Sequence, residues 1–257
     1  MIPEAYVTHW SSFAPWPTLV QVEQDLLLSR LICEVANDPY LGRELVFRGG
    51  TCLHKLRITP GRRYSEDLDH VRVSAGGIQP LTSALTALGQ GLGFDVRTRV
   101  GEHPKIYFRT PAADGAQIRI KVEVDTRERA AVEPLEGVKF AVVSPFWSGS
   151  ATVQMFSTPE LVATKIRALY QRKKGRDLFD LWLALSDLGL TGDQLLTAFG
   201  PYRPEGMTAG RAEENLRAKL ADDAFRTDLE PLVGSWPACF DIDEAGELLV
   251  TEVLRKL

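Results

Sequence analysis

The stretch from residue 47 to residue 70 reads FRGGTCLHKLRITPGRRYSEDLDH, and it indicates both the fold and the chemistry. A strand-like run ends at Gly49 and Gly50, whose bare backbone lets N–H groups approach phosphate oxygens closely. Asp67 and Asp69 lie two residues apart, so on an extended strand their carboxylates point the same way. Two aligned carboxylates suit a Mg²⁺ ion that also binds a nucleotide's phosphates. An anion-binding turn followed by a carboxylate pair indicates nucleotidyl transfer, although either motif alone is a weak signal.

The bulk composition excludes several classes of protein. The 257 residues, 44% of them hydrophobic, suffice for one large domain or two modest ones. The net charge of −4 means that any contact with nucleic acid must come from local basic patches. Three cysteines without CxxC spacing argue against a disulfide framework and a structural zinc site. With no signal-peptide layout and no apolar run near ~20 residues, we expect a soluble cytoplasmic protein that makes no membrane contact.

Periodicity predicts a mixed first part and a helical second part, which meet near residue 150. In residues 1–150 we expect helices at 17–37, 51–56 and 80–92, and strands at 44–48, 68–73, 94–100, 105–109 and 116–125. Residues 133–150 look irregular apart from a strand-like 138–143. In residues 151–257 we expect helices at 158–170, 177–188, 193–199, 211–226 and 242–256. Thr51 and Thr158 are the predicted helix caps.

The predicted strand 116–125 alternates strictly between apolar and charged residues. Glu123 and Asp125 therefore share its polar face, and either is a candidate for a third metal carboxylate. Three carboxylates on neighbouring strands would suffice for two Mg²⁺ ions. The alternative is that Glu123 faces solvent and pairs with a cation on the next strand.

Six cations fall within twelve residues farther along the chain: Lys165, Arg167, Arg172, Lys173, Lys174 and Arg176. A solvated helix end is the ordinary explanation for such a run. Lys165, however, has apolar neighbours, so we expect it to face inward, where it would act as a point charge on a triphosphate. Asp177 and Asp180 share a helical face and would fix Lys165 or Arg176, or contact the nucleotide. The run at 172–176 is the only hint of RNA as a partner.

The loop between the glycines and the aspartates carries three arginines: Arg57, Arg62 and Arg63. They are candidates for contacts to phosphates or to an RNA backbone, and a solvent-exposed basic loop is an equal alternative. Ser65 precedes Asp67 by two residues, and its default role is to cap the turn.

Five motifs, in order across about residues 44–185, resemble those of the AbiEii/MenT nucleotidyltransferase toxins, a branch of the DNA polymerase β-like superfamily. The motifs are 47-FRGGTCLHK-55, 63-RYSEDLD-69, 120-IKVEV-124, 159-PELVATKIRAL-169 and 174-KGRDLFDL-181. The resemblance implies an α+β fold: a polymerase β-like core with a short mixed sheet flanked by helices, followed by a C-terminal α-helical region.

The resemblance also implies roles for residues. Asp67 and Asp69 would bind Mg²⁺, with Glu123 preferred to Asp125 as a third ligand. Asp67, Asp69, Lys165 and Asp177 would be the catalytic residues, the last two contributed by the helical domain. The implied nucleotide-binding set is Gly49, Gly50, Thr51, Ser65, Arg167, Arg176 and Asp180.

Family membership implies a toxin of a toxin–antitoxin pair, monomeric when free and neutralised by a cognate antitoxin. It would transfer NMP from NTP, with CTP or UTP favoured, to the 3′ end of tRNA, which blocks aminoacylation and translation. Ser65 is the implied site of a silencing phosphorylation. The alternatives are a nucleotidyltransferase that modifies a protein hydroxyl or a small molecule, and a non-catalytic nucleotide-binding module.

Overall fold

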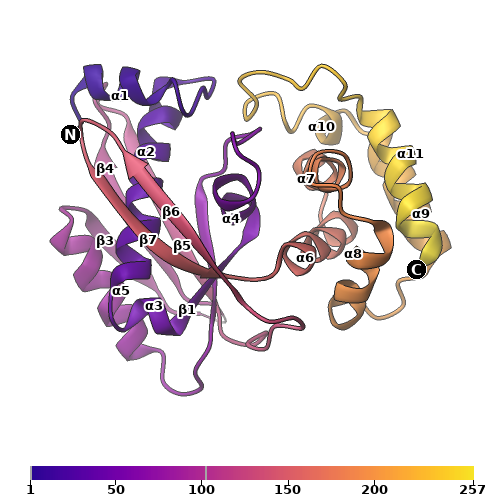
Figure 1. Ribbon diagram of the computed structural model, residues 1–257, viewed down its shortest axis with the longest axis horizontal. Coiled ribbons are helices and arrows are strands. Elements are labelled where there is room, and N and C mark those ends of the chain that lie inside the picture. The colour runs from indigo at the N-terminus through magenta and orange to yellow at the C-terminus, as the bar shows by residue number, and fades with distance from the viewer. Residues whose placement is uncertain (1, 102) are drawn as a thin grey trace. The chain divides into compact units, whose positions relative to one another are not determined.

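The computed structural model describes residues 2–101 and 103–257, and the chain divides into two compact units that meet after Phe156. The first unit contains a seven-stranded sheet in the order β3-β4-β5-β2-β1-β7-β6 (Figure 1). Its strands are β1 (Leu45–Arg48), β2 (Asp67–Arg72), β3 (Asp95–Arg99), β4 (Lys105–Pro111), β5 (Gln117–Asp125), β6 (Glu136–Val143) and β7 (Ser148–Met155). Its helices are α1 (Glu4–Trp10), α2 (Leu19–Asn37), α3 (Leu41–Glu44), α4 (Gly49–Leu56) and α5 (Gln79–Gly91). This mixed sheet with flanking helices confirms the predicted α+β class.

The sheet is mixed at its centre. β2 pairs antiparallel with β1 and parallel with β5, while β1 pairs parallel with β7. The outer pairs β3–β4, β4–β5 and β6–β7 are antiparallel. The central position of β2, with pairing on both sides, fixes the direction of the side chains at its first residues.

Apolar side chains on one face of the sheet form the core with α2 and α5. The predicted alternation in β5 is confirmed, because Ile118, Ile120, Val122 and Val124 are all fully buried. Helix α2 begins at a capping box between Thr18 and Gln21, which satisfies backbone N–H groups at its N-terminus. Helix α2 contacts β5, β6 and β7. The charged residues of β5, such as Lys121 and Glu123, lie on the opposite face of the strand.

Three local predictions were wrong. Helix α4 begins at Gly49, so Thr51 lies inside its first turn and caps nothing. Helix α6 (Thr158–Gln171) is capped by Ser157, whose hydroxyl accepts from the Glu160 N–H at 3.3 Å. The stretch predicted as irregular after 143 contains the first residues of β7, whose Ser, Gly, Thr and Gln residues hide its strand character. Because β7 joins the sheet, the first unit extends to Phe156 and beyond residue 150.

The second unit, Ser157–Leu257, is helical in the part of the chain that the structure describes. After α6 come α7 (Gly175–Ser186), α8 (Gly192–Phe199), α9 (Ala209–Leu220), α10 (Asp223–Arg226) and α11 (Ile242–Glu252), with 3₁₀ turns η1 (Gly200–Tyr202) and η2 (Leu254–Lys256). Helix α6 packs against α7 and α8, and Phe179, Trp182 and Phe240 form an aromatic cluster beside them. Within residues 2–101 and 103–257, no helix is long and apolar enough to cross a membrane.

Candidate functional site

The carboxylate pair lies at the beginning of β2, on the face of the sheet that carries charged residues. Leu68 and His70 are buried on the opposite face, so alternation along the strand directs Asp67 and Asp69 together. Asp67 is paired in register with Lys121 of β5, and Asp69 with Glu123. The parallel pairing of β2 with β5 therefore brings Glu123 beside the carboxylate pair, as the sequence predicted.

Gly49 has a backbone conformation and a close neighbour, Asp69, that only glycine accommodates. Its φ of +84° lies in the region that favours glycine, and an added Cβ would lie 2.3 Å from Asp69 Oδ2. Helix α4 begins at this glycine, and the N-cap residue Arg48 makes no side-chain cap hydrogen bond. The first N–H groups of a helix have no partner within it, so this turn presents donors next to a carboxylate.

Thr51 holds the loop before β2 in place. Its hydroxyl donates to the carbonyl oxygen of Asp67 at 2.5 Å and lies 2.9 Å from Ser65 Oγ. Thr51 is 1% exposed and Ser65 is half-buried. The threonine thus fixes the backbone of Asp67 relative to the glycine turn.

Glu123 is held by two lysines. Lys121 Nζ lies 2.9 Å from Glu123 Oε2 and 3.0 Å from Asp67 Oδ2, and Lys105 Nζ lies 3.3 Å from Glu123 Oε1. Burial would raise the pKa of Glu123, but the hydrogen bonds and charges of both lysines lower it below its ordinary value. The alternative of a cross-strand ion pair is therefore what the structure shows for Glu123.

Asp125 has a structural environment. Its carboxylate pairs with Arg48 at 2.8 Å and accepts the backbone N–H groups of Arg127 and Glu128. Burial raises its pKa, while these hydrogen bonds and the Arg48 charge outweigh that effect and lower it. Asp125 ends β5 and shapes the turn that follows.

The structure supports a magnesium site built from two carboxylates rather than from three. In the described parts of the chain, no group of three or more His, Cys, Asp or Glu side chains is placed to hold a metal ion. Mg²⁺ usually takes one or two carboxylates, with waters and substrate phosphates completing its shell. Asp67 and Asp69 provide that number, and the bare Gly49 leaves space for the Asp69 carboxylate.

The arginine loop before β2 is only partly available to a ligand. Arg63 is 2% exposed, and its guanidinium donates to the carbonyl oxygen of Tyr64 at 3.0 Å. Arg57 forms an ion pair with Glu136 of β6. Of the three arginines, Arg62 alone is exposed, so the predicted phosphate contacts of this loop reduce to that residue.

In the second unit, Lys165 lies in a buried ionic cluster. Its Nζ is 2.8 Å from Asp180 Oδ2 and 3.7 Å from Asp177 Oδ1, and both carboxylates are fully buried. Arg172 binds Asp177 through two hydrogen bonds of 2.7 Å. The predicted inward direction of Lys165 is confirmed, because the residue is 5% exposed.

The basic run at 172–176 is neutralised within the second unit. Arg176 binds Asp228 through Nε at 3.0 Å and through a second nitrogen at 3.1 Å. Of the two cations predicted as partners of Asp177 and Asp180, Lys165 is therefore the one that pairs with them. Lys174 also pairs with Asp228, and Lys173 pairs with Asp222. These partners lie about fifty residues away along the chain, and no local pattern revealed them.

Two further residues of α6 and α9 have defined surroundings. The Arg167 guanidinium lies 5.3 Å from the ring centroid of Tyr202, whose hydroxyl donates to buried Glu160. Lys219, which sequence reasoning missed, donates to the carbonyl oxygens of Leu169 and Tyr170 at the end of α6. Burial lowers the pKa of Lys219 to about 8, against the opposing charge of Asp177.

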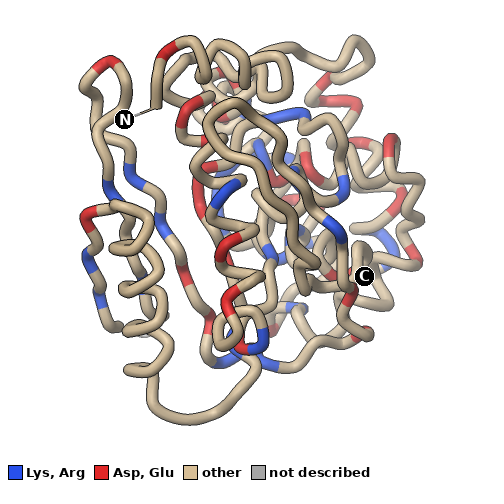
Figure 2. Tube along the Cα trace, turned by 60° about the vertical axis from the view of Figure 1, so that its left-hand side comes forward, with Lys and Arg blue, Asp and Glu red and all other residues tan. Residues whose placement is uncertain are grey.

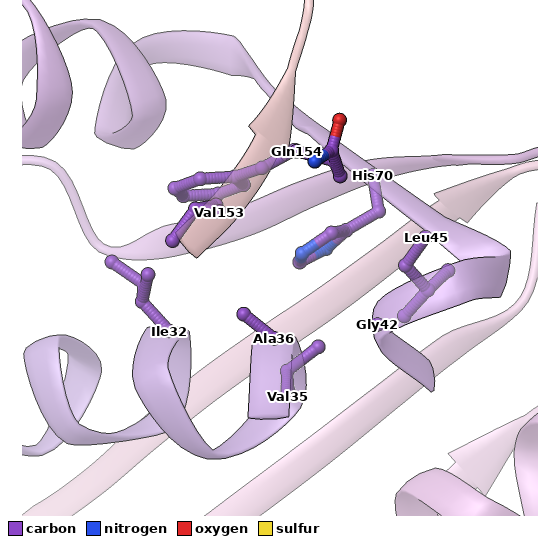
Figure 3. Close-up of a pocket in the computed structure, with 9 residues that line it drawn as sticks. Ile32, Val35, Ala36, Gly42, Leu45, His70, Val153 and Gln154 are labelled. Atoms are coloured by element: carbon purple, nitrogen blue, oxygen red, sulfur yellow. The ribbon is translucent and has the colours of Figure 1, made fainter. Parts of the chain in front are cut away.

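A small apolar pocket lies between α2 and the sheet (Figure 3). His70 lines it, so it is on the face of β2 opposite to Asp67 and Asp69. Residues of α2, β1, β2 and β7 line it, including Ile32, Phe47, His70 and Val153. The His70 ring stacks on Phe47 with centroids 5.0 Å apart. Burial lowers the pKa of His70 to about 4, so the ring is neutral at physiological pH. Without a charged lining residue, this pocket is unsuited to a triphosphate.

A mixed sheet that presents an Asp-x-Asp pair beside a glycine turn agrees with the nucleotidyltransferase predicted from the sequence. The chain belongs to the nucleotidyl transferase AbiEii toxin family of type IV toxin–antitoxin systems, whose sequence model matches residues 30–241. This match confirms the family expected from the five motifs, and with it the enzyme class.

Solved structures share the fold. MenT4, a nucleotidyltransferase toxin from Mycobacterium tuberculosis, is 18% identical, with 97% of this chain and 99% of that chain covered and a TM-score of 0.55. A protein from H. pylori assigned as a nucleotidyltransferase is 17% identical, with 90% and 93% covered and a TM-score of 0.53. Among curated proteins we find no match. At these identities the structural likeness establishes the fold alone.

Proposed function

We propose that this nucleotidyltransferase toxin transfers NMP, with CTP or UTP as the favoured donor, to the 3′ end of tRNA in a Mg²⁺-dependent reaction. Blocked aminoacylation would then stop translation. The observation that supports the proposal is the closeness of Gly49, the first residue of α4, to the Asp69 side chain: an added Cβ would lie 2.3 Å from Asp69 Oδ2. The enzyme class and the toxin family come from the family match.

Each residue of the first unit has a proposed task. Asp67 and Asp69 hold Mg²⁺, which when bound neutralises phosphate charge and lowers the pKa of the attacking hydroxyl. Gly49 and Gly50 offer backbone N–H groups to the triphosphate, and Thr51 keeps Asp67 in position. Glu123, the third carboxylate implied by the resemblance, is engaged by Lys121 and Lys105, so the proposal assigns the metal to Asp67 and Asp69.

In the second unit, Lys165 is the proposed cation for the phosphates, acting as a point charge. Asp177 and Asp180 hold it, because both lie within 4 Å of its ammonium group. Arg167 and Ser65 complete the proposed nucleotide-binding set. The two hydrogen bonds from Arg176 to Asp228 favour a structural role for that arginine.

The proposed partners are tRNA and a cognate antitoxin, with the free toxin monomeric and cytoplasmic. Ser65 is the proposed site of silencing phosphorylation. Its hydroxyl lies 2.9 Å from Thr51, which in turn binds the backbone of Asp67. A phosphate there would add a charge of about −1.5 to −2 near the metal carboxylates, and this charge would repel a nucleotide.

The test is incubation of the protein with Mg²⁺, total tRNA and each α-³²P-labelled NTP in turn, resolved on a denaturing gel. We expect label on tRNA with CTP or UTP and its loss in Asp67→Ala. Glu66→Ala is the matched control, because this neighbouring carboxylate is exposed. Label on a protein band, or on a small molecule alone, would replace tRNA as the acceptor, and no label under any condition would refute the proposed reaction.

A further inference from the structure

A basic surface lies on the sheet of the first unit, next to the carboxylate pair, and it is invisible in the linear sequence. In the register of the sheet, Arg97 is opposite Tyr107, Tyr107 is opposite Lys121, and Lys121 is opposite Asp67. Directly opposite residues share a face of a sheet. This row of side chains therefore runs from the edge strand β3 to the first metal carboxylate.

Two neighbouring rows add to this surface. In one, Arg99 is opposite Lys105, which is opposite Glu123. In the other, Asp95 is opposite Arg109, which is opposite Arg119. We call the whole set the basic face: Arg97, Arg99, Lys105, Arg109, Arg119 and Lys121, with Tyr107 among them. Figure 2 shows Lys and Arg positions recurring along neighbouring strands at the left of the view.

Three arginines of the basic face form no ion pair within the described parts of the chain, although Asp95 lies opposite Arg109 in the sheet. Among residues 2–101 and 103–257, Arg99, Arg109 and Arg119 make no ion pair. The Nε of Arg109 is buried and has no hydrogen-bond partner in the same residues. The Arg119 guanidinium lies 5.6 Å from the ring centroid of Tyr107. In a chain with a net charge of −4, this local excess of positive charge would attract an anionic partner.

Protection of the sheet edge does not explain these charges. Charged residues on an edge strand prevent pairing with other chains, and that accounts for Arg97 and Arg99 on β3. Arg109 and Arg119, however, lie on β4 and β5, which have a neighbour on both sides. The opposite face of β3 and β4 is packed, since Val96 and Phe108 lie against Gly89 of α5. The basic face is thus the side of these strands that α5 leaves uncovered.

We propose that the basic face binds the sugar–phosphate backbone of the acceptor RNA and directs its 3′ end to Asp67 and Asp69. This inference rests on the proposed function and names the surface that recognises its substrate. Arginine forks bind phosphate oxygens, and an aromatic ring on an open sheet stacks on a base. From β3 to β2 the rows cross three strand spacings of ~4.8 Å, or about 14 Å, which accommodates a few extended nucleotides.

The proposal replaces the basic run at 172–176 as the source of RNA affinity. The cations Arg172, Lys173, Lys174 and Arg176 each pair with an aspartate of their own unit. Those of the basic face include three arginines with no such partner among the described residues. An acidic protein would also be attracted to positive charge, but an aromatic ring beside unpaired arginines suits stacked bases better.

The test measures binding of a 5′-fluorescein-labelled RNA oligonucleotide and of labelled total tRNA by fluorescence anisotropy, without NTP, from 50 to 300 mM salt. In Arg109→Gln/Arg119→Gln we expect the Kd to rise at least about tenfold near 0.1 M salt. The slope of log K against log salt should fall in magnitude by about 1.4, at ~0.7 per lost phosphate contact with a single strand. Lys173→Gln/Lys174→Gln is the matched control and should stay within about twofold of wild type.

A second pair, Arg97→Gln/Arg99→Gln, replaces exposed side chains and covers the case in which the first pair fails to fold, as judged by its thermal melt. Unchanged affinity and slope in both folded pairs, or loss in the Lys173/Lys174 pair alone, would overturn the assignment. Polyglutamate binding that the basic-face variants lose while they keep RNA binding would assign the face to an acidic protein and also overturn it. If wild type labels tRNA but these variants bind RNA normally, only this inference fails, whereas absence of both labelling and RNA binding removes tRNA as the acceptor.

Discussion

Replacement of Lys165 by methionine should destabilise the second unit strongly, in addition to abolishing transfer. Lys165 is 5% exposed, and its ammonium group lies 2.8 Å from Asp180, a fully buried carboxylate. Methionine keeps most of the volume of the side chain but removes the cation. Breaking a buried ion pair by removing one partner typically costs ~3–5 kcal/mol, because the remaining charge stays buried.

The size of the effect can be read as a melting temperature. The second unit spans Ser157–Leu257, close to the size at which 1 kcal/mol shifts Tm by about 4 °C. We therefore expect Lys165→Met to lower the Tm of this unit by roughly 12–20 °C in differential scanning calorimetry of the full chain. From the sequence alone, a Lys165 variant would be expected to melt near wild type; the burial of its partners reverses that expectation.

A double variant separates the ion pair from other effects. In Lys165→Met/Asp180→Leu both charges are replaced by apolar groups, and such replacement is often neutral or stabilising. We expect the double variant to recover most of the lost stability while remaining inactive. Lys173→Met is the control, since its pair with Asp222 is exposed and should contribute less than about 1 kcal/mol. A Lys165→Met protein that melts within about 4 °C of wild type, roughly 1 kcal/mol, would refute the assignment of a buried, energetically coupled pair.

Three further predictions concern the first unit. Asp67→Ala should abolish labelling of the acceptor yet lower the free energy of unfolding by less than about 1 kcal/mol, because its pair with Lys121 is partly exposed; a large drop in Tm would contradict this. Gly49→Ala should abolish transfer and lower the free energy of unfolding in urea by at least about 2 kcal/mol, because its Cβ would meet Asp69 Oδ2 at a positive φ. The control Gly76→Ala, also at a positive φ but in open space, should lower that free energy by only about 1 kcal/mol. Equal losses in the two variants would show that the Asp69 contact is unimportant. Burial lowers the pKa of His70 from 6.5 to about 4, so the unfolded state binds more protons between these pH values. The free energy of unfolding should therefore fall by about 3 kcal/mol as the pH drops from 6.5 to 4. Urea unfolding of His70→Gln should lack this pH dependence, and an unchanged pH profile in that variant would exclude His70 as its source.

Local pattern predicted most elements of the first unit. The Gly49–Gly50 turn, the Asp67/Asp69 strand and the alternation of β5 each follow from the short-range chemistry of a few adjacent residues. Prediction failed at β7, where small and polar residues give no strand signal and only pairing with β1 and β6 makes the strand. It also failed at Thr51, because a cap depends on where the helix begins, and here that is set by Gly49.

The sequence predicted which residues belong to the candidate site, but it did not predict which partners surround them. That Lys165 faces inward follows from its apolar neighbours, whereas its pairing with Asp180 depends on how α6 packs against α7. The basic run at 172–176 suggested a solvated helix end or an RNA partner, but distant aspartates at 222 and 228 pair with Lys173, Lys174 and Arg176. Ion pairs between residues about fifty positions apart leave no periodic signal in either segment.

The sequence by itself determined the kind of chemistry, because a glycine turn and an Asp-x-Asp strand are complete within 21 residues, Gly49 to Asp69. The family was expected from five ordered motifs across about residues 44–185, which include this stretch, and the family match confirms it. Only the tertiary structure decided where positive charge is available, since the basic face is assembled from β3, β4 and β5 through strand register. Side-chain alternation is local, but register depends on which strands pair and how they are aligned, and that is a property of the whole sheet.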